Sequence, residues 1–211
     1  MCTPAEPTRV QRKHDAAFLG ALLAAIERDV VPKTKAAVTE GNKVFGACIL
    51  RKDTLATVVA DTNREMEWPL LHGEVSTLRS LQAVRERPPP RECVFVSTHE
   101  PCSLCLSAIT WSGFDNFYYL FSYFDTKDSF NIPHDLRMLK EVFRCDDGAY
   151  GRQNAYWTCY SIGHLIDALP EDDDAAKDTL RAKVADLRAA YAAMSDVYQA
   201  SKNDTDAIPL S

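Results

Sequence analysis

Residues 93–111 read CVFVSTHEPCSLCLSAITW, a short apolar run followed at once by a segment with helical spacing. The run from Cys93 to Ser97 predicts a short buried strand. The apolar pattern from Cys102 to Trp111 predicts a helix. A strand that feeds directly into a helix is the building unit of α/β proteins, so this stretch sets the expected fold class.

The flanking sequence repeats the alternation of strands and helices. Upstream, two β-rich runs lie on either side of Arg51-Lys52-Asp53, which predicts a hairpin. The helical pattern that begins at His72 stops at Pro88-Pro89-Pro90. The expected elements are a helix over 15–40 with a bend at Pro32, strands over 44–50 and 55–60, a helix from 72, a strand over 117–121 and a helix over 136–143. This order predicts an α/β sandwich with helices on both faces of a central sheet.

The chain divides into one main domain and two flanking pieces. Residues 1–13 are expected to be loose, 14–170 to form the domain, 171–200 to form an amphipathic C-terminal helix and 201–211 to be a flexible tail. The helix carries a stripe of apolar residues at spacings of four and three: Leu180, Val184, Leu187, Tyr191, Met194 and Tyr198. The stripe fits either docking onto the chain's own domain or a dimer contact.

Composition and charge argue against a nucleic-acid-binding protein, a membrane-spanning segment and a signal peptide. With 46% hydrophobic and 26% charged residues, the 211-residue chain is typical of a soluble globular protein. Its net charge of −6 gives no electrostatic footprint for nucleic acid and favours a small-molecule substrate. The apolar run over 16–26 is too short to span a bilayer, and Glu27-Arg28-Asp29 stands where a signal peptide would need small residues. Seven cysteines, an odd number, suit a reducing compartment, so a cytoplasmic location without membrane association is expected.

Two clusters carry the residue types of a metal site. Cys102 and Cys105 lie three apart at the start of a helix, so both sulfurs can reach one ion. His72 opens the preceding helix and can complete a nitrogen and thiolate set that selects Zn²⁺. Three protein ligands leave the fourth position open, which is typical of catalytic zinc, and Glu74 could exchange protons there. A redox pair, a structural zinc completed by Cys48, Cys93 or His99, and a binding module without catalysis remain as alternatives.

These clusters form the H-x-E…P-C-x-x-C arrangement of zinc nucleobase deaminases. On that basis the sequence resembles the cytidine deaminase-like superfamily over about residues 44–124. Val44-Phe45-Gly46-Ala47 is similar to a segment of bacterial guanine deaminases and tRNA adenosine deaminases. Residues 100–111 are similar to guanine deaminases, and residues 71–78 resemble fungal cytosine deaminases.

The resemblance implies a fold, a cofactor and a set of site residues. The fold would be a three-layer α/β/α sandwich around a mixed, roughly five-stranded sheet, assembled as a homodimer. One catalytic Zn²⁺ per chain would be held by His72, Cys102 and Cys105, with Glu74 as the proton shuttle. Expected substrate contacts are Phe45, Ala47, Asn63, Trp111, Asp125 and Asp128. Residues 154–157 would form either an aromatic lid or part of the core, and His134 and His164 are read as structural.

The implied activity is hydrolysis of a C–N bond in a cyclic amidine, with release of ammonia. The expected substrate is a free nucleobase or small nucleoside, with a guanine-like aminopurine or aminotriazine ranked ahead of cytosine. The alternatives are a tRNA adenosine deaminase, which would need a basic groove for phosphates, and a non-catalytic zinc scaffold of the same fold.

Overall fold

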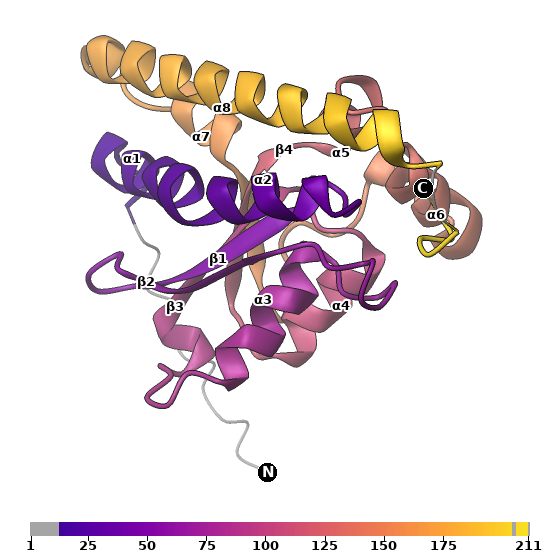
Figure 1. Cartoon of the computed structure of the whole chain (residues 1–211). Helices are drawn as coiled ribbons and strands as arrows, with labels where there is room; N and C mark the ends of the chain where they lie inside the picture. Colours follow the sequence, from indigo (N-terminus) through magenta and orange to yellow (C-terminus); the bar gives the residue numbers. More distant parts are fainter. Residues whose placement is uncertain (1–12, 204–205, 211) are drawn as a thin grey trace.

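A mixed sheet forms the centre of the computed structural model, which describes residues 13–203 and 206–210. In the described part, five strands lie in the order β2-β1-β3-β4-β5 (Figure 1). Their bounds are β1 Gly46–Arg51, β2 Thr57–Thr62, β3 Cys93–His99, β4 Asn116–Phe121 and β5 Thr158–Ser161. Strand β1 pairs antiparallel with β2 and β3, whereas β3–β4 and β4–β5 pair parallel.

Helices cover both faces of the sheet (Figure 1). One face carries α1 (Ala16–Ala25), a π-helical turn (Ile26–Val30), α2 (Val31–Thr39), α7 (Ile162–Asp167) and α8 (Asp174–Ser201). The other face carries α3 (Gly73–Gln82) and α4 (Ser103–Trp111). Beyond one end of the sheet lie α5 (Tyr123–Asp128) and α6 (His134–Phe143), and three short 3₁₀ turns occupy Pro90–Glu92, Asp146–Gly148 and Glu171–Asp173.

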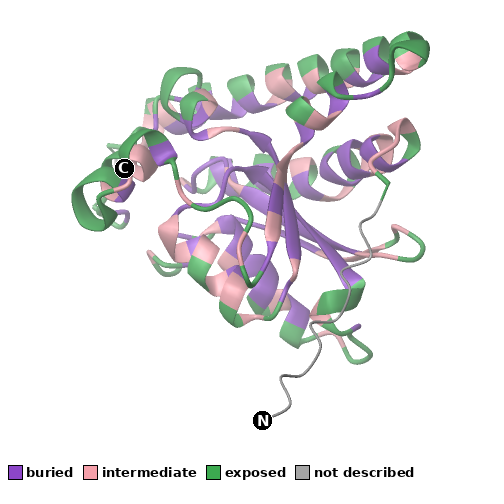
Figure 2. Ribbon diagram, turned by 180° about the vertical axis from the view of Figure 1, so that it is seen from behind, coloured by how far each residue is buried: buried purple, intermediate pink, exposed green. Residues whose placement is uncertain are grey.

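Alternation along the strands produces the three layers. Successive side chains of a strand point to opposite faces of its sheet. Cys48 and Val96 accordingly pack beneath α1 and α8, whereas Ile49 and Phe95 pack beneath α3 and α4. Strands β3 and β4 are buried throughout, β1, β2 and β5 include half-buried residues, and the exposed residues lie on helix surfaces and loops (Figure 2). The predicted α/β/α sandwich around a mixed sheet, with an added C-terminal helix, is therefore confirmed.

The expected bend in the first helix has a definite form. Pro32, which cannot donate a backbone hydrogen bond, lies in the first turn of α2 directly after the π-helical turn, so the helix is irregular at this point. Strand β5 and helices α5 and α7 were not expected, because segments of four to six residues are too short to show a period. Trp157 packs edge-on against Phe117 at a ring-centroid distance of 4.9 Å, so it belongs to the core.

The C-terminal helix docks on its own domain. Its apolar stripe packs against α1, α2 and α7, and Leu187 and Tyr191 are buried in the larger core cluster. The homodimer stays a prediction.

The segment after α8 differs from the expected flexible tail. Ile208 is buried, because three consecutive apolar residues at 208–210 turn back onto the domain. The loose N-terminus expected over 1–13 lies almost wholly outside the described residues. In the part of the chain that the structure describes, no helix is both long enough and apolar enough to cross a membrane.

Candidate metal centre and active site

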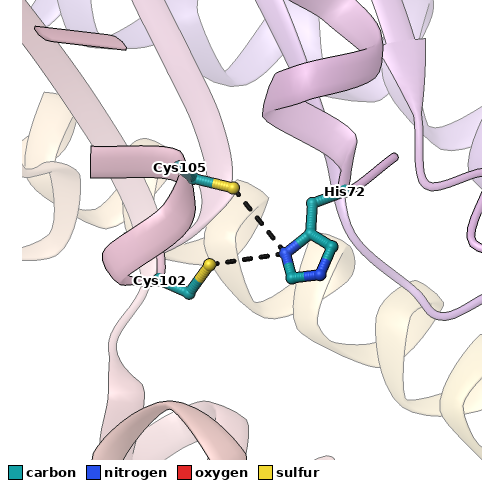
Figure 3. A group of neighbouring side chains, drawn as sticks. All are labelled: His72, Cys102 and Cys105. Carbon is teal, nitrogen blue, oxygen red and sulfur yellow. Dashed lines mark hydrogen bonds between the residues drawn. The ribbon is translucent and has the colours of Figure 1, made fainter. Parts of the chain in front are cut away.

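The N-termini of α3 and α4 lie side by side and bring the candidate metal ligands together. His72 caps the N-terminus of α3 and Cys102 caps that of α4, both with extended backbone. Cys105 follows in the first turn of α4, and its sulfur points toward the imidazole of His72 (Figure 3). Helix N-termini carry partial positive charge, so this arrangement favours the thiolates that bind metal.

The spacing of the three donor atoms fits a tetrahedral zinc ion. His72 Nδ1 lies 3.3 Å from Cys102 Sγ and 3.7 Å from Cys105 Sγ (Figure 3). Zinc with Zn–S of about 2.3 Å and Zn–N of about 2.1 Å at tetrahedral angles would hold nitrogen and sulfur about 3.6 Å apart. The residues therefore fit the ion.

A fourth protein ligand is missing from this group in the described part of the chain. His99, one candidate, instead points into an aromatic cage, with its ring centroid 5.0 Å from those of Phe121 and Phe130. Cys48 packs in the core on the opposite face of the sheet. The arrangement is that of a three-ligand site with one open position.

The site concentrates negative charge that a dication would neutralise. Burial alone would lower the pKa of His72, but the Cys102 thiolate and the carboxylates of Glu65 and Glu74 raise it to about 9. A hydrogen bond from Cys105 and the nearby His72 hold the pKa of Cys102 well below its usual range. Burial holds the pKa of Cys105 well above its usual range.

Glu74 faces the open side of the metal group. Its side chain is buried, Oε1 accepts a hydrogen bond from Ser97 Oγ at 2.8 Å, and Oε2 lies 3.2 Å from Cys105 Sγ. Burial, followed by the charge of Cys102, raises the pKa of Glu74. A buried carboxylate with raised proton affinity beside a metal position is suited to general acid–base catalysis.

Two glycines allow this close assembly. A Cβ on Gly73 would lie 2.7 Å from the backbone N and Cα of Gly46. The first turn of α3 therefore rests directly on the start of β1, with no side chain between them. This contact sets His72 and Glu74 close to Phe45, the residue before β1.

A buried carboxylate supports the loop that carries Cys102. Glu100 accepts hydrogen bonds from the backbone N–H of Tyr123 at 3.1 Å and from Tyr150 Oη at 2.9 Å. Arg152 also donates to it, at 2.5 Å. The hydroxyl of Tyr123 donates to the carbonyl of Pro101 at 2.5 Å. These hydrogen bonds hold in place the two residues that precede Cys102.

A cavity of about 350 Å³ opens over the metal group. Its walls are mainly apolar and include Phe45, Leu104, Ile132 and Met138. Carboxylates come from Glu65, Glu74 and Asp135, and among the described lining residues the only lysine or arginine is Lys43. The remaining lining residues are Pro69, Leu70, His72, Cys102, His134, Pro209 and Leu210.

The sequence-predicted substrate contacts divide into two groups. Phe45 lines the cavity, and Asn63 lies behind its wall, with Oδ1 accepting from the backbone N–H of Glu65 at 3.0 Å. Asn63 Nδ2 is buried and has no hydrogen-bond partner among the described residues. Ala47 is fully buried in the core beneath α3 and does not line the cavity.

Three other predicted contacts lie away from the cavity. Trp111 ends α4 and is 91% exposed, because the nine residues of that helix carry it about 13 Å from the end that bears the ligands. Asp125 is the third residue of α5 and accepts a hydrogen bond from the backbone N–H of the N-cap residue Ser122 at 2.9 Å, and it also pairs with Arg188 at 2.8 Å. Asp128 is exposed and lies 3.4 Å from Lys127.

The cavity also contains residues that the sequence did not indicate. Asp135 and His134 reach it from the start of α6, and Lys43 and Glu65 from the loops that flank the β1–β2 hairpin. No local motif marks any of them, because each arrives there through the packing of its own element. His134, which the sequence indicates as structural, also lines the cavity.

Comparison with known proteins agrees with this geometry. Residues 24–121 match the family model described as the cytidine and deoxycytidylate deaminase zinc-binding region. The matched stretch contains all three candidate ligands and Glu74, and it confirms the resemblance drawn from the sequence. No curated protein matches the chain.

Several solved structures are similar to the chain at low identity. A guanine deaminase from Nitrosomonas europaea is 21% identical over 86% of this chain and 89% of its own, with a TM-score of 0.46. A structure from a study of tRNA:A34 deaminases is 16% identical over 74% of this chain and 99% of its own, with a TM-score of 0.46. A guanine deaminase from Bacillus subtilis is 26% identical over 51% of this chain and 72% of its own, with a TM-score of 0.42.

Proposed function

From the cytidine and deoxycytidylate deaminase zinc-binding region carried by residues 24–121, we propose that the protein is a zinc-dependent hydrolytic deaminase of a free nucleobase or small nucleoside. The observation that carries the proposal is the group of three candidate metal ligands with buried Glu74 beside it, at the wall of a cavity of about 350 Å³. One Zn²⁺ per chain belongs to the proposal.

The proposed chemistry exchanges an amino group for an oxygen. Bound Zn²⁺ would supply a Lewis acid that activates water at neutral pH. Glu74 takes the proton released from that water on its carboxylate and delivers it to the ring nitrogen next to the carbon under attack. The water oxygen, now a hydroxyl group on the ring carbon, gives its remaining proton to Glu74, which passes it to the amino group. The C–N bond then breaks, ammonia leaves and the ring carbon becomes a carbonyl. Ser97 holds Oε1 of Glu74 in place during both transfers.

The charge of the cavity supports an uncharged substrate. Its lysine, Lys43, is already paired with Glu65, and Asp135 adds a further carboxylate. A phosphate group would find no unpaired lysine or arginine among the described lining residues, and burying an unpaired charge is strongly unfavourable. Free bases and nucleosides are therefore favoured over nucleotides, and a tRNA substrate, which needs cationic contacts to phosphates, is disfavoured.

Asp135 and Asn63 are proposed as the polar contacts to the base. Asp135 has a carboxylate on the cavity wall that can accept N–H groups of an amidine or aminopurine edge. Asn63 has a buried Nδ2 that can donate to a ring carbonyl or nitrogen. Phe45 offers an aromatic face to the ring. This pattern of donors and acceptors is compatible with the aminopurines ranked first from the sequence.

The test is ammonia release from zinc-loaded protein over a panel of substrates. The panel contains guanine, cytosine, adenine, ammeline, the corresponding nucleosides and their 5′-monophosphates, with Glu74→Ala as the control variant. We expect turnover of a base or nucleoside, at least tenfold weaker turnover of the matching nucleotide, and none by Glu74→Ala with its zinc retained. Activity in the Glu74→Ala variant would overturn the proton-transfer role, and silence across the panel with zinc bound would overturn the proposed substrate class.

A further inference from the structure

A buried ion pair lies against the metal group. Lys43 Nζ donates to Glu65 Oε1 at 3.0 Å, and the two side chains are only 6% and 4% exposed. Removing two charges from water is costly, and buried pairs contribute little net stability. Stability alone therefore does not explain why the Lys43–Glu65 ion pair lies at the wall of the cavity.

Strand pairing brings these two residues together. Gly46 is opposite Thr62 in the β1–β2 hairpin, and the ladder continues one step further, because the backbone N–H of Asn63 donates to the carbonyl of Phe45 at 2.7 Å. Lys43 precedes Phe45 by two residues and Glu65 follows Asn63 by two. Both side chains are therefore delivered to the same point beside His72.

His72 lies between this pair and the metal position. Its Nδ1 faces the two cysteine sulfurs, and its Nε2, on the opposite edge of the ring, lies 3.5 Å from Glu65 Oε1. The second oxygen of Glu65, Oε2, is buried without a hydrogen-bond partner in the described part of the chain. The carboxylate therefore keeps unused capacity to accept a hydrogen bond beside the ring N–H.

We propose that Glu65, held in place by Lys43, is a positioning residue that accepts the Nε2–H of His72 and so presents Nδ1 as the metal-binding nitrogen. A histidine ligand commonly donates its second N–H to a carboxylate, which fixes the ring and strengthens the metal bond. This inference rests on the metal site of the proposed function but is independent of which substrate is deaminated. Its consequence is that zinc affinity depends on a residue that does not touch the ion.

The test compares zinc affinity in Glu65→Gln with that in Glu67→Gln. Glu67 is a matched control because it lies two residues further on, is half exposed, pairs with Arg79 at 2.8 Å and does not line the cavity. Competition with a chelator gives the zinc dissociation constant, and the visible spectrum of the Co²⁺-substituted protein reports ligand geometry. We expect Glu65→Gln to weaken zinc binding about 10-fold to 100-fold and to shift the Co²⁺ bands. Glu67→Gln should leave both unchanged.

A second variant separates this effect from the cost of an unpaired buried lysine. The double variant Lys43→Met/Glu65→Gln removes both charges, and near-UV circular dichroism checks that it is folded. The proposal expects zinc binding to stay weakened in the double variant. Affinity that returns to the wild-type value there, or that never changes in Glu65→Gln, overturns it.

These readouts are separate from those of the proposed function. Weakened zinc binding in Glu65→Gln, together with no ammonia release by the wild type, would support the positioning role and refute the deaminase proposal. Normal turnover with unchanged zinc affinity in Glu65→Gln would do the reverse.

Discussion

Asp135 contributes its carboxylate to the cavity from α6, an element that carries no metal ligand. Burial, followed by the charge of Cys102, raises the pKa of Asp135 to about 8 in the metal-free chain. The candidate ligands and Glu74 could be predicted because His72 and Glu74 lie together at the start of α3, and Cys102 and Cys105 lie one turn apart at the start of α4. Asp135 could not be predicted, because its position depends on how α6 packs. In the sequence alone, nothing distinguishes it from the nearby residues Asp125 and Asp128, which lie outside the cavity.

Exchange of Asp135 for Asn tests its contact with substrate. Leaving a buried polar group without its hydrogen bond costs about 1–3 kcal/mol, so we expect kcat/KM to fall about 10-fold to 100-fold, chiefly through KM. Asp128→Asn is the control, since that exposed side chain pairs with Lys127 outside the cavity. Steady-state kinetics on the best substrate of the panel provide the measurement, and equal effects in the two variants would contradict the assignment.

His99 makes stability depend on pH. Burial of its ring lowers the pKa to about 3, whereas in the unfolded chain the value is near 6.5. Between these values the unfolded state binds more protons, so acidification favours unfolding. We expect this group to cost the wild type about 1 kcal/mol of unfolding free energy between pH 6.5 and pH 5.5.

Urea denaturation of zinc-loaded protein at the two pH values measures this loss. The variant His99→Gln should be less stable at neutral pH but should lack this part of the pH dependence. Zinc content is determined at each pH, so that metal release is not mistaken for the effect. An identical pH dependence in wild type and variant would contradict the assignment.

At the scale of elements, α3 and β1 meet backbone to backbone at Gly73 and Gly46. The sequence shows where each of the two elements begins, but not that their backbones touch at Gly46 and Gly73. That contact follows from three-dimensional packing. The short strand β5 could not be predicted for a different reason. Its four residues are too few to show the alternation of apolar and polar residues that distinguishes a strand from a loop.

Gly73→Ala should disrupt the metal centre. The new methyl group would meet backbone atoms, which cannot move as a side chain can, so α3 must shift and take His72 with it. We expect a loss of about 1–3 kcal/mol in unfolding free energy and a clear loss of bound zinc.

Gly20→Ala is the opposite case and serves as the control. Its Cβ would meet Leu180 Cδ2 at an ordinary 3.7 Å in the interior of α1, so we expect a gain of about 0.5–1 kcal/mol and unchanged zinc. Denaturation curves and zinc analysis of both variants make the comparison. Full zinc content in Gly73→Ala would show that the close contact can relax.

At the scale of the whole molecule, α8 links the core to the cavity. Its buried stripe attaches it to α1, α2 and α7, and the segment after it places Pro209 and Leu210 on the cavity wall. The amphipathic stripe predicted that one face of the helix would be covered, by its own domain or by a second chain, and in the structure its own domain covers it. The return of residues 206–210 could not be predicted, because three apolar residues among polar ones have no period to indicate where they pack.

A chain that ends at Asn203 tests the contribution of this segment. Removing the wall formed by Pro209 and Leu210 should raise KM several-fold, because the substrate loses apolar contact, while zinc content stays unchanged. The control is a chain that lacks only Ser211. Kinetics of the two truncated proteins are compared with those of the full chain, and an unchanged KM in the shorter protein would show that the segment does not contact the substrate.

The seating of Pro209 and Leu210 has a practical consequence for anyone who purifies this protein. An affinity tag fused after Ser211 would begin one residue from the cavity wall. A polyhistidine tag there would bring a string of imidazoles within reach of the ion that His72, Cys102 and Cys105 are arranged to hold. Metal analyses and inhibitor screens on such a fusion would report on the tag as well as on the protein. Tags for this chain therefore belong at the other end, or should be removed before any zinc is measured.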